Sequence, residues 1–198
     1  MKLLAYVCVV ALLILSSGAV RADEASAVKA VENLGGKVTR DDKLPGKPVI
    51  GVNLAGTQVT DTGLKELADL RQLATLDLGG NKVTDTGLKE LTTLQQLTAL
   101  KLSNTQVTDA GLKQLAPLDS LQHLELYDTE VTDAGLKHQA ALEKLEVLYL
   151  GFLPLTDKGV DSLIKPTRLR TLNLEGTDVT EAGGKKLKQG LPKTEIIP

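Results

Sequence analysis

Residues 73–144 consist of three consecutive units that read LATLDLGGNKVTDTGLKELTTLQQ, LTALKLSNTQVTDAGLKQLAPLDS and LQHLELYDTEVTDAGLKHQAALEK. Their central segment recurs at a strict interval of 24 residues, without insertion or deletion, at Val59-Thr60-Asp61, Val83-Thr84-Asp85, Val107-Thr108-Asp109, Val131-Thr132-Asp133, Leu155-Thr156-Asp157 and Val179-Thr180-Glu181. A fixed period of about 20–50 residues is typical of a solenoid in which one structural unit stacks on the next. We therefore expect the function to lie on a repetitive surface and not in an enclosed pocket.

Each unit begins as a strand and ends as a helix. Leucines alternate with other residues at its start, as in Leu76/Leu78 and Leu100/Leu102, which predicts a strand with one buried face. Leucines follow at helical spacing, at Leu88, Leu91 and Leu94 in one unit. The sequence therefore predicts a short strand, a turn and about two helical turns per unit. We expect parallel strands centred near residues 52–54, 76–78, 100–102, 124–126, 148–150 and 172–174, with helices beginning near the acid of each Thr-Asp/Glu step.

An acid precedes the helical part of each unit, and a glycine lies inside its first turn. Asp61 and its equivalents stand where a carboxylate can accept N–H bonds from a helical first turn, so we expect helix capping. A calcium ladder is the alternative, but repeat calcium sites require several oxygen ligands in each loop. A glycine costs helix stability, so its recurrence predicts close packing between coils. The glycines are Gly63, Gly87, Gly111, Gly135, Gly159 and Gly183.

Polar residues recur before the turn, and we expect them to bond loop backbone groups in a stacked ladder. They are Thr57, Asn81, Thr105, Thr129 and Thr177. Leu153 interrupts this ladder in the fifth unit. Gln139 stands where other units carry leucine, which predicts weaker packing of the fourth helix. Gly184 likewise replaces a leucine in the last unit, as is usual for a terminal repeat with one unpartnered face.

The pattern LxxLxLxxTxVTDxGLKxLxx resembles the leucine-rich repeat family, in its short bacterial and F-box-associated subtype with a T-D-x-G-L segment on the convex side. The resemblance covers six units, residues 49–192. It implies an α/β fold, a right-handed leucine-rich repeat solenoid with a concave parallel β-sheet and convex short α-helices. It also implies the family's usual task of binding other macromolecules, and it carries over no catalytic residues.

Residues 1–22 have the pattern of a signal peptide. Lys2 precedes an apolar run from Leu3 to Leu15, and Val20-Arg21-Ala22 predicts cleavage after Ala22. The run is short for a membrane span, which needs about 20 residues, although an uncleaved anchor is the alternative. Cys8, the only cysteine, lies inside the run and does not follow the small residues of a lipoprotein site. The mature chain then has no disulfide or thiol chemistry, and we expect secretion or a periplasmic or cell-envelope location.

The repeat domain has predicted caps at both ends. Residues 23–48 are expected to form an N-terminal cap, with an amphipathic helix over 25–34 (Ala25, Val28, Val31 and Leu34), a strand over 37–40 and a turn over 44–48. Residues 49–198 then form the repeat domain, in which Ile196-Ile197 aligns with the strand position of Leu172 and closes the C-terminal end.

The net charge and the positions of the histidines argue against nucleic-acid binding, metal binding and catalysis. Signal removal takes the formal net charge from −2 to −4, because the segment holds two basic residues and no acid. Without a basic stripe, a nucleic-acid partner is not expected. His123 and His138 are the only histidines, and the register places them on opposite faces, where they cannot share a metal or a proton. The sequence predicts no enzyme activity, no metal and no cofactor.

One patch of the concave face differs from the rest. The outward positions of the first three units carry small or charged groups, whereas every aromatic residue of the mature chain falls in the fourth and fifth: Tyr127, Tyr149 and Phe152. Strand alternation points the two tyrosines outward as a diagonal pair about 7–8 Å apart. Phe152 either joins this surface or refills the core with Leu153. Exposed tyrosines on a rigid sheet are typical binding anchors, so the predicted ligand-binding residues are Tyr127, Tyr149, His123, Glu125, Lys101 and Phe152.

The sequence predicts an exported, monomeric, non-catalytic module that recognises a protein, or a glycan, through its concave face. The alternative is a structural or passive cell-envelope repeat protein without a high-affinity ligand. A substrate receptor of an F-box ubiquitin ligase, which the subtype suggests, is not expected, because residues 23–48 are too few for an F-box and the signal peptide exports the chain. Nothing in the sequence identifies the ligand.

Overall fold

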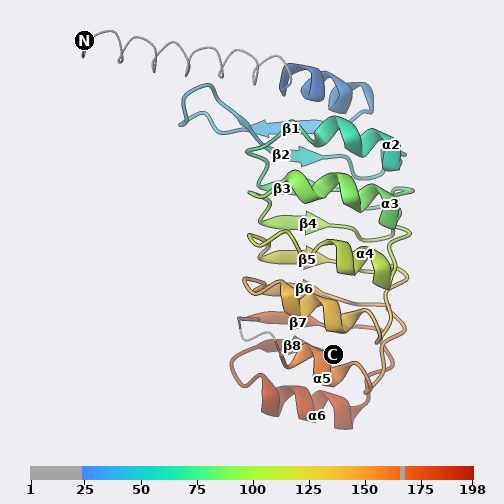
Figure 1. The fold of residues 1–198 in the computed structure, drawn as a ribbon. Coiled ribbons are helices and arrows are strands. Elements are labelled where there is room, and N and C mark those ends of the chain that lie inside the picture. The colour runs from blue at the N-terminus through green and yellow to red at the C-terminus, as the bar shows by residue number, and fades with distance from the viewer. Residues whose placement is uncertain (1–23, 166–167) are drawn as a thin grey trace, which may run out of the picture.

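The computed structural model describes residues 24–165 and 168–198, in which eight strands form one sheet in chain order. The strands are β1 (Lys37–Arg40), β2 (Val49–Asn53), β3 (Thr75–Asp77), β4 (Ala99–Lys101), β5 (His123–Glu125), β6 (Val147–Tyr149), β7 (Thr171–Asn173) and β8 (Glu195–Ile197). Neighbours from β2 to β8 pair in parallel, so the predicted repeat strands are confirmed. Figure 1 shows the strands stacked from one end of the solenoid to the other, with helices along one side. The predicted signal peptide lies outside the described residues.

The helical side is shorter and more varied than expected. Its segments are α2 (Asp61–Leu64), η1 (Lys65–Leu67), α3 (Asp85–Leu88), η2 (Lys89–Thr93), α4 (Asp109–Gln114), η3 (Leu136–Ala141), α5 (Val160–Leu163) and α6 (Glu181–Gly190), where η marks a 3₁₀ helix. Helices begin at the acid in the first three units and in the last, as predicted. In the fourth and fifth units the helix begins three residues later, at Leu136 and Val160, so that part of the prediction is wrong.

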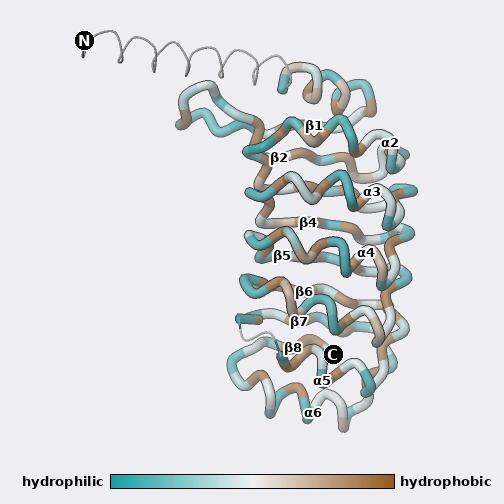
Figure 2. The backbone as a smooth tube through the Cα atoms, viewed as in Figure 1, coloured by the Kyte–Doolittle hydropathy of each residue, from teal (hydrophilic) through white to brown (hydrophobic). Residues whose placement is uncertain are grey.

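The core is a column of leucines in the same register in every unit. Leu76, Leu100, Leu124, Leu148 and Leu172 pair from strand to strand and are buried. The helical leucines close the column from the other side, and Figure 2 shows the same hydrophobic pattern repeated coil after coil. Because the core contacts of each unit are made with the units on either side of it, stability is approximately a sum of unit and interface contributions.

The recurring aspartate binds the next coil instead of capping its own helix. Thr84 donates its backbone N–H to Asp61 Oδ1 (2.8 Å) and its hydroxyl to Asp61 Oδ2 (2.7 Å). The same paired bonds join Asp85–Thr108, Asp109–Thr132, Asp133–Thr156 and Asp157–Thr180. The helix N-cap is the threonine itself, since Thr84 Oγ1 also accepts from the Thr86 N–H at 3.2 Å. The prediction that the aspartates cap helices is therefore wrong, and we call this set of contacts the Asp–Thr ladder.

The recurring glycine makes room for this ladder. A Cβ on Gly87 would lie 2.5 Å from Asp61 Oδ1, and one on Gly159 would lie 2.6 Å from Asp133 Oδ1. Both distances are shorter than any ordinary contact, so a side chain at this position would displace the carboxylate. The predicted close packing between coils is thus confirmed. The group that lies against each of these glycines is the aspartate side chain of the preceding coil.

The polar residues before the turn bond the loop backbone, but mostly within their own coil. Thr57, Thr105, Thr129 and Thr177 each donate to the carbonyl three residues back. Asn81 alone among the five bridges two coils, because it accepts from the Val59 N–H and donates to Leu54 O. The expected stacked ladder is therefore a series of local bonds with one bridge.

Gln139 also bridges coils. It is fully buried, and its Nε2 donates to Ser162 O at 3.0 Å, while its Oε1 has no partner in the described structure.

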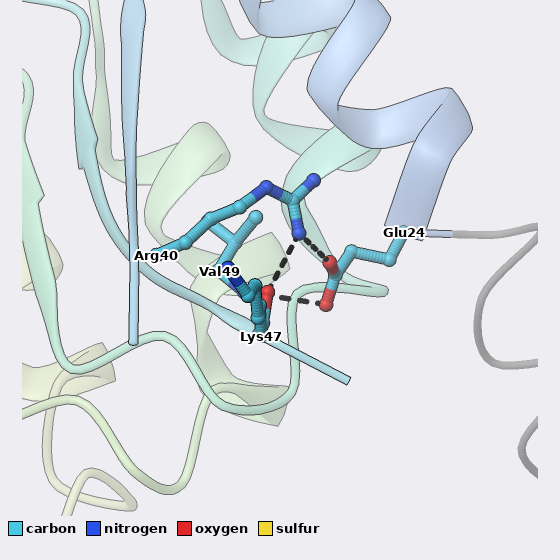
Figure 3. A network of polar contacts seen from close by, with 4 residues as sticks. All are labelled: Glu24, Arg40, Lys47 and Val49. Carbon is cyan, nitrogen blue, oxygen red and sulfur yellow. Dashed lines mark hydrogen bonds and ion pairs between the residues drawn. The ribbon is translucent and has the colours of Figure 1, made fainter. Parts of the chain in front are cut away.

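A helix over residues 24–33 and β1 cover the first coil. β1 pairs antiparallel with β2, whereas the repeat strands are parallel. Val31 is buried and Val28 and Leu34 pack against the core, as predicted, whereas Ala25 is exposed and Ala27 takes its place in the buried face. Figure 3 shows how the start of the helix is held: Glu24 accepts from Arg40 Nη1 (2.6 Å) and from the Val49 N–H (3.3 Å). Arg40 Nη1 also donates to Lys47 O.

At the other end, β8 adds to β7 with Leu172 opposite Ile196, as the alignment predicted. Across residues 24–165 and 168–198, no helix has the length and apolar character needed to cross a membrane.

Candidate recognition surface

Strand alternation places the predicted binding residues on the open face of the sheet, the concave face. In β4, β5 and β6 the middle leucine is buried, whereas the residues on either side of it are partly exposed. Lys101 lies on β4, His123 and Glu125 on β5, and Tyr149 on β6. Glu125 pairs with Tyr149 in the register, so the charged and aromatic groups occupy adjacent positions.

A charged cluster centres on one carboxylate oxygen. Glu125 Oε1 lies 2.8 Å from Lys101 Nζ and 2.8 Å from His123 Nε2. The glutamate is the least exposed of the three, with 16% of its side chain accessible against 43% for the lysine. The hydrogen bond to Glu125 raises the pKa of Lys101, so the lysine stays charged. Because Lys101 and Glu125 neutralise each other, this cluster contributes little net charge to the face.

Aromatic rings continue from this cluster across the sheet in an unbroken series, which we call the aromatic ridge. The ring of His123 meets Tyr149 at 5.4 Å, Tyr149 meets Tyr127 at 6.4 Å, and Tyr127 meets Phe152 at 5.5 Å. All three contacts are edge-to-face, with interplanar angles of 73°, 88° and 62°. This arrangement suits the aromatic quadrupole, and each contact holds its neighbours in place.

Tyr127 reaches two coils along the solenoid. Its hydroxyl shares its one proton between Glu175 Oε2 at 2.7 Å and Asn173 Oδ1 at 3.0 Å. Burial of the ring and donation to Glu175 both raise the pKa of Tyr127, so the phenol remains protonated. The ring lies over Gly151, where a Cβ would fall 2.6 Å from Cε1. Asn173 and Glu175 are absent from the predicted binding residues. The sequence could have indicated them, because the 24-residue register aligns them with outward positions of the other units.

Phe152 is exposed and adopts an unusual backbone conformation. Its φ is +58°, and 56% of its surface is accessible. The other units carry glycine, asparagine or aspartate at this left-handed position, as Gly56, Gly80, Asn104, Asp128 and Gly176. Leu153 beside it is buried, so the core is filled by the leucine and the alternative of a core role for Phe152 is wrong. A bulky residue at positive φ is strained and is a reason to look for function.

A shallow hollow of about 330 Å³ adjoins the charged cluster. Small residues line it, including Gly51, Thr75 and Ala99, and Asp77 and Lys101 supply its polar groups. The hollow therefore lies over β2, β3 and β4, and the aromatic ridge lies over the coils that follow.

The chemistry of the two histidines follows their positions. His123 lies on β5, whereas His138 lies on η3 of the helical side. Within the part of the chain that the structure describes, no group of three or more His, Cys, Asp or Glu side chains is placed to hold a metal ion. The aromatic rings of the concave face can stack on a ligand, and its charged and polar side chains can form ion pairs and hydrogen bonds with it.

Comparisons with known proteins identify the repeat. The sequence model of the Leucine Rich repeat family matches residues 52–68, 71–91 and 93–116, which span three successive repeats. A comparison with curated protein sequences found no significant match. The fold is that of a leucine-rich repeat solenoid with a sheet on one face and short helices on the other.

Solved structures of bacterial leucine-rich repeat proteins resemble the chain. An internalin of Listeria monocytogenes is 25% identical over 67% of this chain and 36% of its own, with a TM-score of 0.56. A leucine-rich repeat protein of Leptospira interrogans is 28% identical over 67% of this chain and 33% of its own, with a TM-score of 0.55. Internalin C2 of Listeria monocytogenes, at 22% identity and a TM-score of 0.55, shows the fold alone over 86% of this chain and 81% of its own. The chain thus spans about a third of the length of the first two.

Proposed function

We propose that this chain is an exported, non-catalytic recognition module that binds a protein partner through the aromatic ridge of its concave face. A leucine-rich repeat fold supports protein–protein recognition in general. The observation that carries the proposal is the ridge itself, four rings in continuous edge-to-face contact, two of them on strands of the sheet and two on the turns that follow those strands. Export rests on the signal-peptide pattern of residues 1–22, and we assign the repeats to the short subtype from their 24-residue pattern.

The ridge has the properties of an interface centre. Tyr127, Tyr149 and Phe152 concentrate all the aromatic area of the mature chain in one place. Mutual contacts and the bonds from Tyr127 to Asn173 and Glu175 hold the rings before any ligand arrives. The rings of the ridge would therefore lose little side-chain entropy when a partner binds. Rigid aromatic groups of this kind are the usual hot spots of interfaces. His123 would contact the partner as part of the ridge, and Lys101 and Glu125 would border the contact.

Two other functions differ from this one in observable ways. A glycan could also stack on the tyrosines, and a passive cell-envelope protein would have no tight ligand. The strained, exposed Phe152 favours recognition over a passive role, because a structural repeat would retain glycine or asparagine at this position.

The experiment is a capture assay with the mature chain as bait in cell-envelope extracts. Wild type is compared with a Tyr127→Ala/Tyr149→Ala variant and with a Lys65→Ala/Lys89→Ala control on the helical side. Removing one central tyrosine should cost about 2 kcal/mol or more, roughly thirtyfold in affinity. The lysine control should bind as wild type does, because solvated lysines contribute little.

Protein identification and glycosidase treatment of the captured material separate a protein from a glycan ligand. Equal affinity of the wild type and both variants for any ligand found would show that the ridge is not the site. Failure to capture any ligand would favour the passive role. Circular dichroism and urea unfolding of each variant exclude a folding defect as the cause of lost binding.

A further inference from the structure

We propose that the Phe152 end of the aromatic ridge receives a basic side chain, preferably an arginine, from the partner protein. This inference rests on the proposed function and names the chemistry of its ligand. The proposed contact surface consists of Phe152 and Tyr127, with Asp128 one coil before Phe152 and Glu175 one coil after it, and we call it the acidic rim.

Backbone bonds place the two acids beside Phe152. Asp128 donates its N–H to Gly151 O (3.1 Å), directly before Phe152 in the chain, and Phe152 donates its own N–H to Glu175 O (2.8 Å). Asp128 occupies the same left-handed position as Phe152, one coil earlier. The phenylalanine ring leans onto Gly176, where a Cβ would lie 2.5 Å from Cδ1. Any side chain at residue 176 would displace the ring, so the glycine allows this placement.

The rim carries negative charge that the protein leaves unpaired. Among the described residues, neither Asp128 nor Glu175 forms an ion pair. Tyr127 donates to Glu175 Oε2, and no bond to Glu175 Oε1 is present in the described structure. Lys101, which lies on β4 beside the ridge, is already paired with Glu125. The acidic rim therefore has a formal charge of about −2 at neutral pH, with acceptors exposed to a ligand.

Charge complementarity indicates which kind of partner side chain would bind at the acidic rim. An acidic or purely apolar partner would bury two carboxylates without compensation, which costs binding energy. A cation over the face of an exposed ring gains from the quadrupole, and arginine is the more frequent partner in such contacts. The planar guanidinium can stack on Phe152 while its N–H groups reach the neighbouring carboxylates. Lysine would satisfy the charge but lacks this planar stacking.

The test uses the mature protein, labelled for NMR, and two short Gly/Ser peptides. One peptide carries arginines, and the other carries citrulline, which has nearly the same shape without the charge. We expect the arginine peptide to shift the backbone amides of Phe152 and Gly176, and the citrulline peptide to leave them unchanged. Raised salt should weaken the arginine complex, because the rim is exposed.

Two variants and one control identify the contacts. Phe152→Asn keeps a residue type found at the equivalent Asn104, and Glu175→Gln keeps the side-chain shape. Each should weaken the arginine peptide about threefold, the usual size of an exposed cation–π or ionic contact. Glu66→Gln, which removes an exposed acid from η1 on the helical side, should leave the affinity unchanged.

Equal shifts with both peptides would overturn the proposal, as would equal effects of Glu175→Gln and Glu66→Gln. Its failure differs from failure of the proposed function. If envelope capture still depends on Tyr127 and Tyr149 but arginine has no effect, the concave face recognises a partner of another chemistry. If capture ignores both tyrosines, the proposed function itself fails.

Discussion

The Asp–Thr ladder predicts a specific energetic coupling between Asp109 and Gly135, which lie in adjacent coils. Asp109 accepts the Thr132 N–H at 2.7 Å and the Thr132 hydroxyl at 2.8 Å. Asp109→Ala removes both bonds and leaves a backbone N–H without its acceptor. At about 1–2 kcal/mol for each charge-assisted bond, we expect a loss of about 2–4 kcal/mol in the free energy of unfolding.

Gly135→Ala should be costly only while the carboxylate is present. The added Cβ would lie 2.8 Å from Asp109 Cγ and even closer to Oδ1. Overpacking of this kind costs about 1–3 kcal/mol. It is partly offset by about 0.4–1 kcal/mol, because alanine can adopt the φ of −73° at this position and has less conformational entropy than glycine in the unfolded chain. In the Asp109→Ala background the carboxylate is absent, and the remaining close atom is the residue 109 Cα at 3.1 Å. The double variant should therefore be about 1–2 kcal/mol more stable than the sum of the single effects predicts.

Urea unfolding of the mature chain, followed by circular dichroism, measures all four members of this cycle. The control pairs Asp109→Ala with Gly183→Ala, whose close neighbour is Asp157 in a different coil, and these two effects should add. Additivity within about 0.5 kcal/mol for Asp109 and Gly135 would refute the ladder as the reason for the glycine. A loss of only about 1 kcal/mol for Asp109→Ala, independent of Gly135, would instead match simple helix capping.

Three further outcomes follow from the same structure. Leu100→Ala should cost about 2–5 kcal/mol in urea unfolding, because the fully buried leucine leaves a cavity between two coils; a loss below about 1 kcal/mol would contradict this. Gln139→Leu should change stability by no more than about 1 kcal/mol, since the lost bond to Ser162 O is offset by removal of an unpartnered buried oxygen; a larger loss would show a further partner of Gln139. The hydroxyl and amide of Thr180 lower the pKa of Asp157 below its ordinary 3.8. Its stabilising contribution is therefore complete above that value and lost as the pH falls through the lower folded-state pKa, and NMR titration with an Asp157→Asn comparison should show it.

The architecture was predictable because its causes are local. The 24-residue register recurs without insertion or deletion, and each strand pairs with the strands of the adjoining coils, so an alignment in the sequence is also an alignment in space. This is why the strand centred on Leu76 and the terminal pairing of Ile196 with Leu172 were both placed correctly. The later helix starts of the fourth and fifth units, at Leu136 and Val160, were missed because propensity is weak over so few residues.

The contact partners of individual side chains could not be predicted from the sequence in the same way. An aspartate before a helix is equally suited to cap that helix or to bind the next coil, and the position of Thr84 relative to Asp61 decides between them. The repeat pattern points the tyrosines outward, and their contacts with one another and with Phe152 depend on side-chain rotation. Tyr127 bonds Glu175, 48 residues later, because stacking brings distant segments within reach of one ring. Alternation along a strand specifies the face on which a residue lies, but side-chain packing between coils specifies its partner.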